Sequence, residues 1–275
     1  MTTRELQAAP RLAPLYAKAL LPRSEGDSLP DTEYLRTGIE IDPAHLAAYN
    51  QVCEFRLADE LPVTYPHMLA FPLQMALMTQ QDFPFPLLGM VHVANRITQH
   101  RPVRLGERTS MRVRAQNLRP HEKGSQFDVL SELSTEDGVV WSEVSTYLRR
   151  GGGSGSSSGA QLAAPSPNAI WRVPGDIGRR YAEVSGDRNP IHLHPLTAKL
   201  FGFPSAIAHG MWTKARVLAA FEGRLPDAYT VDVRFKLPVL LPAKVAFTSW
   251  RTGDGWAFEL WNAKKPKPHL EGTIS

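Results

Sequence analysis

The sequence has little of what secreted, zinc-binding or membrane-inserted proteins need. Its single cysteine, Cys53, cannot form an internal disulfide, and there is no CxxC pair of the kind that holds structural zinc. Residues 1–22 carry several charges and lack an apolar run long enough for a signal peptide or a membrane span. We therefore expect a soluble cytoplasmic protein that has no membrane partner, in which Cys53 is a small buried apolar residue.

Strongly charged tracts are missing as well. The 275 residues include 31 Lys and Arg against 27 Asp and Glu, and the longest basic cluster is Lys264-Lys265-Pro266-Lys267. A nucleic-acid surface would need clustered basic and aromatic side chains, so we expect no nucleic-acid partner. The mild net charge of +4 suits a ligand that carries phosphates, and 43% hydrophobic residues supply a core for one large or two ordinary domains.

Residues 151–168 are nearly devoid of apolar side chains and read as a flexible Gly/Ser/Pro linker. They divide the chain into an N-terminal domain, residues 1–150, and a C-terminal domain, residues 169–275. The linker contains Gly-Ser-Ser-Ser-Gly, which matches the Gly-x-Ser-x-Gly pattern of hydrolase nucleophiles by its letters. That pattern needs a strand before the serine and a helix after it, so we reject Ser157 as a nucleophile.

Each half consists of helical segments followed by antiparallel strands. In the first half, an N-terminal helical adaptor without a functional role precedes an extended segment, a helix that begins near Pro43, and a second helix with Pro72 near its start. In the second half, a long helix is predicted across residues 205–223. The predicted strands occupy residues 91–103, 108–120, 124–150 with a turn at Glu136-Asp137-Gly138, and residues 230–240, 244–252, 256–262 and 269–275.

Two short patterns occur once in each half at nearly the same offset. Tyr49-x-x-Val52 resembles Tyr181-x-x-Val184, and Pro102-Val103-Arg104-Leu105-Gly106 resembles Pro238-Val239-Leu240-Leu241-Pro242. Matching order and spacing indicate an internal duplication. Because each sheet must bury one face, we expect an α+β protein in which the two sheets pair edge to edge, with the helices on one side.

An acid, an amide and an imidazole lie within six residues of the second half. Asp187, Asn189 and His192 belong to a Gly-Asp-x-Asn-Pro turn between two helical segments, and Pro190 favours an extended Asn189. Taken singly, Asp187 reads as a capping or turn residue and His192 as a structural histidine. Together on one irregular loop, they predict chemistry or binding.

The stretch Tyr181-Ala-Glu-Val-Ser-Gly-Asp-Arg-Asn-Pro-Ile-His192, with Ala198 six residues beyond the histidine, resembles the hydratase 2 motif. That motif is typical of the MaoC-like (R)-specific enoyl-thioester hydratases and dehydratases. The resemblance implies a double hot-dog fold, in which two helix-wrapped antiparallel sheets join into one. Residues 53–58, Cys-Glu-Phe-Arg-Leu-Ala, stand where the first half would carry the motif, so the resemblance implies a degenerate first half.

The same resemblance implies the chemistry: reversible hydration of a trans-2-enoyl thioester to the (R)-3-hydroxyacyl thioester. Asp187 would hold and activate the water, His192 would exchange the proton, and Asn189 would orient the water. The backbone N–H of Gly210 would stabilise the enolate-like oxygen. No metal or redox cofactor is implied, because coenzyme A or phosphopantetheine is part of the substrate.

Several residues near this stretch allow two readings. Arg234 and Lys236 suit the phosphates of coenzyme A or phosphopantetheine, or else an exposed strand face. His194 could complete a metal site with Asp187 and His192, but no further ligand follows at a known spacing, so a packing or surface histidine is favoured. His209 is expected to shape a turn. Three methionines, Met68, Met75 and Met78, could line an acyl tunnel, although a place in the core is favoured.

Two other functions fit the same residues. Hot-dog proteins include thioesterases, and duplicated hot dogs can become acyl-thioester-binding proteins without activity. The sequence leaves open the acyl chain length, the direction of the reaction and the carrier, which is coenzyme A or acyl carrier protein. It also leaves open whether a monomer or a homodimer of double hot dogs forms.

Overall fold

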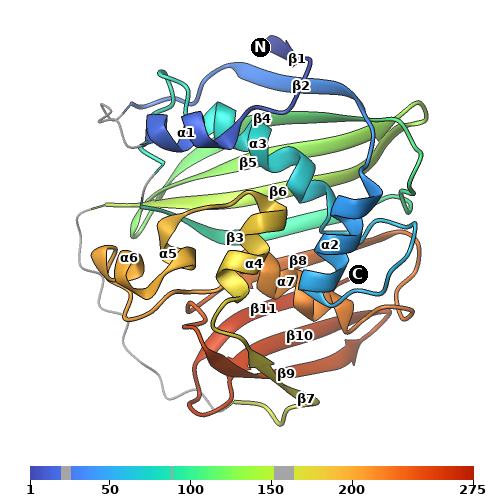
Figure 1. Ribbon diagram of the computed structural model, residues 1–275, viewed down its shortest axis with the longest axis vertical. Coiled ribbons are helices and arrows are strands. Elements are labelled where there is room, and N and C mark those ends of the chain that lie inside the picture. Colours follow the sequence, from blue (N-terminus) through green and yellow to red (C-terminus); the bar gives the residue numbers. More distant parts are fainter. Residues whose placement is uncertain (20–25, 88, 152–163) are drawn as a thin grey trace.

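The N-terminal half forms six strands and three helices in the computed structural model, which describes residues 1–19, 26–87, 89–151 and 164–275 (Figure 1). Helix α2 begins where the Asp42 carboxylate accepts the Ala44 N–H at 2.9 Å, with Pro43 in the first turn. The elements in order are β1 (Thr2–Leu6), α1 (Leu12–Ala19), β2 (Thr32–Ile39), α2 (Pro43–Cys53), α3 (Pro66–Met78), β3 (Met90–Gln99), β4 (Thr109–His121), β5 (Gly124–Thr135) and β6 (Gly138–Arg150).

The C-terminal half follows the same plan with shorter helices. The elements in order are β7 (Ala169–Val173), α4 (Ile177–Ser185), α5 (Pro190–Leu193), α6 (Pro195–Leu200), α7 (Gly210–Ala219), β8 (Tyr229–Phe235), β9 (Ala243–Thr252), β10 (Gly255–Asn262) and β11 (Pro268–Ile274). Among the helices described, none is long and apolar enough to cross a membrane.

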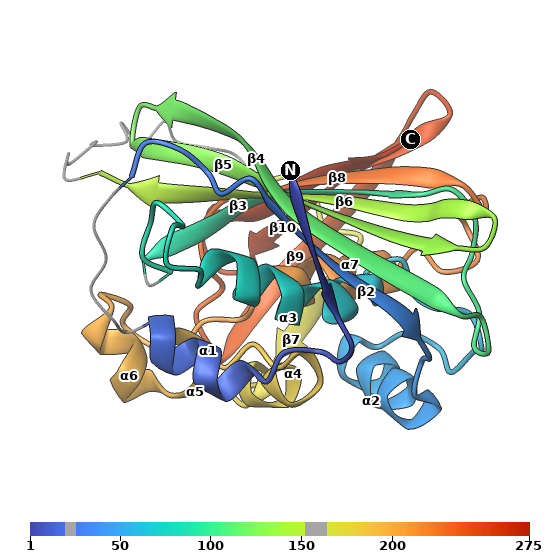
Figure 2. The ribbon, with the colours of Figure 1, turned by 90° about the horizontal axis from the view of Figure 1, so that it is seen from above.

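All the described strands belong to one sheet, ordered β1-β2-β4-β5-β6-β3-β8-β11-β10-β9-β7. The halves join where β3 pairs antiparallel with β8, and Arg96 lies opposite Asp232 in the register, with a 3.1 Å ion pair between them. The helices lie on one face of this sheet (Figure 2). The edge-to-edge pairing and the α+β double hot-dog architecture are therefore confirmed.

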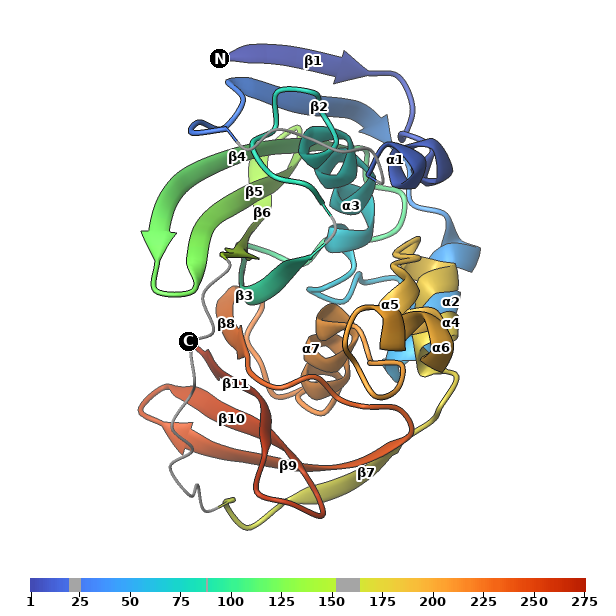
Figure 3. The ribbon, with the colours of Figure 1, turned by 90° about the vertical axis from the view of Figure 1, so that its left-hand side faces the viewer.

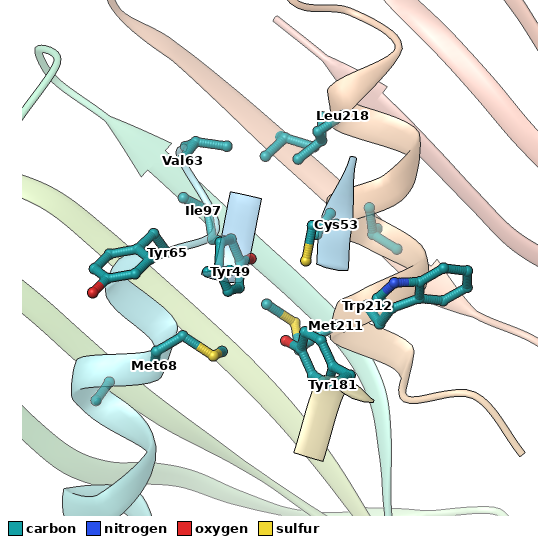
Figure 4. Packing of buried hydrophobic residues seen from close by; sticks show 14 of the residues in the cluster. Tyr49, Cys53, Val63, Tyr65, Met68, Ile97, Tyr181, Met211, Trp212 and Leu218 are labelled. Atoms are coloured by element: carbon teal, nitrogen blue, oxygen red, sulfur yellow. The ribbon is translucent and has the colours of Figure 1, made fainter. Parts of the chain in front are cut away.

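Helices of both halves share one hydrophobic core. Tyr49 of α2 and Tyr181 of α4, the tyrosines of the two matching patterns, lie with ring centroids 6.4 Å apart, and Met211 of α7 is close by (Figure 4). The prediction for Cys53 is confirmed, since this side chain is fully buried. Met68, Met75 and Met78 are also buried in hydrophobic clusters, which agrees with the core reading.

The internal duplication is visible in the backbone hydrogen bonds. In the first half, the segment before α3 pairs with the segment that contains Pro102-Val103. In the second half, the segment before α7 pairs with the segment that contains Pro238-Val239. Equivalent bonds run from Leu61 N to Val103 O at 2.8 Å and from Ala208 N to Val239 O at 2.9 Å, and from Leu105 N to Asp59 O and Leu241 N to Ala206 O, both at 2.8 Å.

Several predicted elements differ from the structure. Pro72 lies inside α3 rather than near its start, because α3 begins at Pro66. Residues 205–209 precede α7 instead of belonging to it, because their backbone pairs with residues 239–241. The segment 124–150 forms two strands around the predicted turn at residues 136–138, but β3 pairs with β6 rather than with β4. The short edge strands β1 and β7 were not predicted.

Most of the predicted linker, including Ser157, lies outside the described residues. The described residues on either side place β6 and β7 far apart in the sheet, with β7 at the edge that closes the C-terminal half (Figure 3). The domain boundaries near residues 150 and 169 remain a prediction from composition.

Candidate active site

The loop that carries Asp187 is anchored by a tight turn at the end of α4. Gly186 has a φ of +71° and donates its N–H to Ala182 O at 3.0 Å. A side chain there would be strained in this left-handed conformation, and its Cβ would overlap Leu12 of α1. Glycine therefore lets α4 end without strain and leaves room for α1 to approach the loop.

Two donors hold one oxygen of the Asp187 carboxylate. Oδ1 accepts the Asn189 N–H at 3.1 Å and the Tyr16 hydroxyl at 3.0 Å. The other oxygen, Oδ2, lies 3.7 Å from Nε2 of His209, beyond hydrogen-bond distance. The side chain keeps 27% of its surface exposed, so the acid is accessible from the site.

His192 lies on α5 and is held in one orientation. Its Nδ1 is 2.8 Å from Ile207 O, and because a carbonyl only accepts, Nδ1 carries the proton. In the neutral ring, Nε2 is then left as an acceptor. The His192 carbonyl lies where a Cβ of Gly178 would stand, so this glycine allows α5 to pack directly against α4.

His209 supports both catalytic candidates. Its Nε2 donates to the backbone carbonyl of Asp187 at 3.0 Å, and its ring stacks on His192 with centroids 3.7 Å apart. It also precedes α7 as the capping residue. The structure thus agrees with the expected turn-shaping role of His209 and adds a direct contact with the Asp187 loop.

The electrostatic environment favours an ionised acid and a neutral imidazole. Burial alone would raise the pKa of Asp187, but His209, His192, the Asn189 N–H and the Tyr16 hydroxyl outweigh it and hold this pKa below its usual range. Burial lowers the pKa of His192 although Asp187 opposes the shift. Burial and the neighbouring His192 lower the pKa of His209 to about 3.

Gly210 is the first residue of α7, where backbone N–H groups have no partner within the helix. A Cβ at this position would lie 3.2 Å from the nearest ring atom of Phe235, the last residue of β8. The glycine therefore allows the Phe235 ring to pack directly against the helix start. A partially positive helix N-terminus suits a developing oxyanion.

The hydrogen bonds of Asn189 are made to neighbouring residues of its own loop. Its backbone N–H binds Asp187, and its side-chain oxygen accepts the Ile191 N–H at 3.4 Å to cap α5. His194 caps α6 in the same way through Leu196 N. The sequence-predicted Asp187, Asn189 and His192 are thus brought together near the start of α7.

Arg234 and Lys236 are not brought into this cluster. Arg234 is exposed and precedes Phe235 on β8, and successive side chains of a strand point to opposite faces. Because Phe235 contacts Gly210 on the helical face, Arg234 lies on the other face of the sheet. Lys236 pairs with Glu271 at 2.7 Å.

Asp187, His192 and His209 could geometrically hold a cation. They each offer one ligand atom, and these atoms lie within 4.8 Å of one another. His209 Nε2 donates its proton to the Asp187 carbonyl, whereas a metal ligand nitrogen must be unprotonated. The donor set therefore suits proton handling better than metal binding, and a metal-free site remains a prediction.

A buried polar network lies next to the site and joins the halves. The Lys214 ammonium on α7 donates to Asn95 O at 3.0 Å and to Asn95 Oδ1 at 2.5 Å. The Asn95 amide and His67 both bond Glu143, which is fully buried. Lys214 lies one helical turn beyond Gly210. The network therefore fixes the position of α7 against the sheet.

Sequence reasoning missed three contributors, Tyr16, Gly178 and Phe235. Each acts through a contact between segments that are distant in the sequence; Tyr16 and Asp187 are separated by 171 residues. The helical spacing around Tyr16 predicted the helix, and nothing in that spacing indicated its partner.

Comparison with known proteins identifies the family. The MaoC like domain model matches residues 168–272. The chain is 42% identical over 263 residues to 3-hydroxyacyl-thioester dehydratase X of Mycobacterium tuberculosis, covering 94% of this chain and 93% of that one. The crystal structure of HtdX from the same organism superposes with a TM-score of 0.80 at 43% identity, over 88% of this chain and 98% of that chain.

A more distant likeness concerns the fold alone. An acyl-ACP thioesterase from Bacteroides thetaiotaomicron matches with a TM-score of 0.57 at 11% identity, over 88% of this chain and 96% of that one. The high identity over nearly the full length of the mycobacterial dehydratase, together with the matched domain, decides the assignment. The chain belongs to the MaoC-like dehydratase family.

Proposed function

We propose that the protein catalyses the reversible hydration of trans-2-enoyl thioesters to (R)-3-hydroxyacyl thioesters, a hydro-lyase reaction of fatty-acid metabolism. The observation that carries the proposal is the cluster of Asp187 and His192, with a free carboxylate oxygen and a free ring nitrogen, at the start of α7. The name of the mycobacterial relative, a 3-hydroxyacyl-thioester dehydratase, supports the same reaction class.

The free atoms match the needs of water addition. A water held by Asp187 Oδ2 and His192 Nε2 gives its oxygen to the β-carbon of the enoyl group, and one of its protons reaches the α-carbon. The carbonyl oxygen gains charge as the new C–O bond forms, and the Gly210 N–H at the helix start stabilises it. Dehydration follows the same path in reverse: the α-proton and the 3-hydroxyl leave as water.

The pKa shifts support these roles. A depressed pKa keeps Asp187 as a carboxylate at neutral pH, so it can accept a proton from the water. The depressed pKa of His192 keeps Nε2 unprotonated and able to take up and return a proton. The Asn189 backbone N–H binds Asp187 Oδ1, which supports a role in holding the acid that orients the water.

A direct assay tests this proposal. Loss of the enoyl-thioester absorbance with crotonyl- and octenoyl-coenzyme A should be rapid for the native protein and lost in Asp187→Asn and His192→Ala. Matched residues outside the site, the exposed Asp254 and the half-buried His121, changed as Asp254→Asn and His121→Ala, should leave the rate unchanged. Full activity in both site variants would overturn the proposal.

The same assay separates the alternatives. Release of free thiol without a change in the enoyl group would show a thioesterase. Binding of acyl thioesters in calorimetry without turnover at any chain length would show a non-catalytic binding protein. No contact within the described site favours either of these over hydration.

The carrier is tested through Arg234 and Lys236. We propose that they meet the phosphates of coenzyme A or phosphopantetheine once the arm has left the site past the end of β8. The double variant Arg234→Ala/Lys236→Ala should then raise KM for coenzyme A thioesters and leave kcat unchanged. An unchanged KM with both coenzyme A and acyl carrier protein would remove these residues from the substrate path.

One chain is sufficient for the proposed function. The β3–β8 pairing completes the joined sheet within a single polypeptide, and both halves contribute to the surroundings of the site. We therefore propose a functional monomer, and light scattering should report a mass near 30.5 kDa. A larger mass that persists at assay concentration would indicate the homodimer.

A further inference from the structure

Helix α1 lies over the catalytic loop, in the helical layer farther from the sheet (Figure 2). It is attached to α3 through a small apolar cluster of Leu15, Phe71 and Met75. Its Leu12 packs against Gly186, immediately before the acid. The N-terminal segment is thus fastened on one side to the N-terminal half and on the other side to the loop of the C-terminal half.

Tyr16 is the polar residue at this contact. Its hydroxyl donates to Asp187 Oδ1 at 3.0 Å and accepts the Arg188 N–H at 2.7 Å. The carbonyl of Gly186 is 3.4 Å away. The hydroxyl therefore binds three consecutive residues of the loop and fixes the side chain and the backbone of the acid together.

The two oxygens of Asp187 are made unequal by these contacts. Oδ1 receives two donors, the Tyr16 hydroxyl and the Asn189 N–H, whereas Oδ2 has no hydrogen bond among the described residues. Hydrogen bonds to a carboxylate favour its charged form and fix its plane. The unbonded oxygen is therefore the one left to accept a further hydrogen bond.

We propose that Tyr16 of α1 is a positioning residue for the hydratase reaction, which saturates Asp187 Oδ1 so that Oδ2 alone handles the water. This inference rests on the proposed function and assigns a task to the N-terminal helix. Tyr16 remains a donor across the working range, because burial and the adjacent Asp187 raise the pKa of its hydroxyl.

Other ionisable groups also face Asp187. They are His192 from α5, His209 before α7, Tyr181 from α4 and Tyr147 from β6. Arg188 adjoins the acid in the chain. All of these stay in place when only the Tyr16 hydroxyl is removed, so a Tyr16→Phe change isolates one donor.

The test is the pH profile of kcat/KM for enoyl-thioester hydration by the full chain. In Tyr16→Phe, we expect the acidic limb to move to higher pH by about one unit, because hydrogen bonding to the charged form lowers a carboxyl pKa. The value of kcat should fall by roughly tenfold, with little change in KM. Circular dichroism and the melting temperature check that α1 is still folded.

Leu12→Ala serves as the matched control on the same helix. It removes packing against Gly186 without touching the carboxylate, so it should lower the melting temperature and leave the acidic limb unmoved. An unmoved limb in Tyr16→Phe, or equal shifts in both variants, would overturn the proposal. Asp187→Asn distinguishes failure of the proposed function from failure of the proposed role of Tyr16. If Asp187→Asn retains full activity, the proposed function fails regardless of the result for Tyr16→Phe.

Discussion

Helices α2 and α4 end in the same way, yet only the second leads into the loop that carries the proposed catalytic acid. Each is followed by a left-handed residue, Glu54 with φ +63° and Gly186 with φ +71°, that returns its N–H to the last turn. The next residue is Phe55 in the first half and Asp187 in the second. The backbone that presents a site has thus been kept where the reactive side chain is absent.

The same comparison extends one residue further. The Arg188 N–H is bound by the Tyr16 hydroxyl, whereas the Arg56 N–H is bound by the Glu222 carboxylate at 3.1 and 3.2 Å. Each loop is therefore closed by a polar group from a distant segment. In the second half that group also binds the Asp187 carboxylate, whereas the corresponding residue of the first half, Phe55, has no polar side chain.

Exchanging the two residues tests the comparison most strongly. Asp187→Phe should reduce kcat by roughly 10³-fold, because the group that activates water is lost. Phe55→Asp in that background should restore nothing, since the first-half loop continues with Arg56-Leu57-Ala58 and has no nearby imidazole equivalent to His192. The enoyl-thioester assay measures both, and any rate recovered by Phe55→Asp would contradict the idea that the first half is only a scaffold.

The oxyanion position gives the next largest effect. Gly210 corresponds to Val63 in the hydrogen-bond pattern of the two halves, and Gly210 lies in close contact with the Phe235 ring. Gly210→Ala would place a methyl group 3.2 Å from the Phe235 ring and should lower kcat by roughly 10- to 100-fold through misplacement of the helix start.

Relief of this crowding is the control for that result. Phe235→Leu in the Gly210→Ala background should recover part of kcat, whereas Val63→Ala should leave kcat nearly unchanged and lower stability. An active Gly210→Ala protein would show that Phe235 yields to the methyl group without misplacing the helix start.

The sequence predicted contacts between residues that are close in the chain and missed contacts between distant segments. Asp187, Asn189 and His192 fall within six residues, and local turn chemistry brings them together, so the motif located the site. Tyr16 and Gly178 act through approaches between separate elements, which periodicity does not encode. Residues 205–209 have helical spacing and were predicted as the start of α7. In the structure their backbone groups bond to residues 239–241 instead of forming a helical turn.

The same limit applies to the sheet. The alternation of β5 and β6 predicted strands, and the repeat predicted that two sheets would join, as β3 and β8 do. Strand β1 is largely exposed and has no alternating pattern of burial, so its pairing with β2 depends on a neighbour that the local sequence does not specify.

A smaller difference between the halves concerns the loss of folding stability at acidic pH. His209 corresponds to Pro62, which cannot titrate. The folded pKa of His209 is about 3, below its ordinary value, so the unfolded chain binds the extra proton as pH falls below roughly 6.5. This stability is complete above that pH and is lost on acidification, by about 2 kcal/mol at pH 5.

His209→Asn should therefore flatten the fall of stability between pH 7 and pH 5, as measured by denaturant unfolding. Some slope should persist, since burial also lowers the pKa of His92 to about 3. An unchanged slope would show that His209 is protonated without cost in the folded protein.

Removal of metal should have the smallest effect of all. The second half brings together Asp187, His192 and His209, and no such set occurs among the described residues of the first half, so any functional cation would belong to the Asp187 loop. We expect dialysis against a chelator to leave kcat unchanged and added zinc to inhibit, because zinc would take the His192 nitrogen and the Asp187 oxygen that water handling needs. Loss of activity on chelation, restored by a divalent cation, would instead make these three residues a metal site. The contrast between the halves would then lie in metal binding, and the Tyr16 hydrogen bond would orient a metal ligand rather than a base.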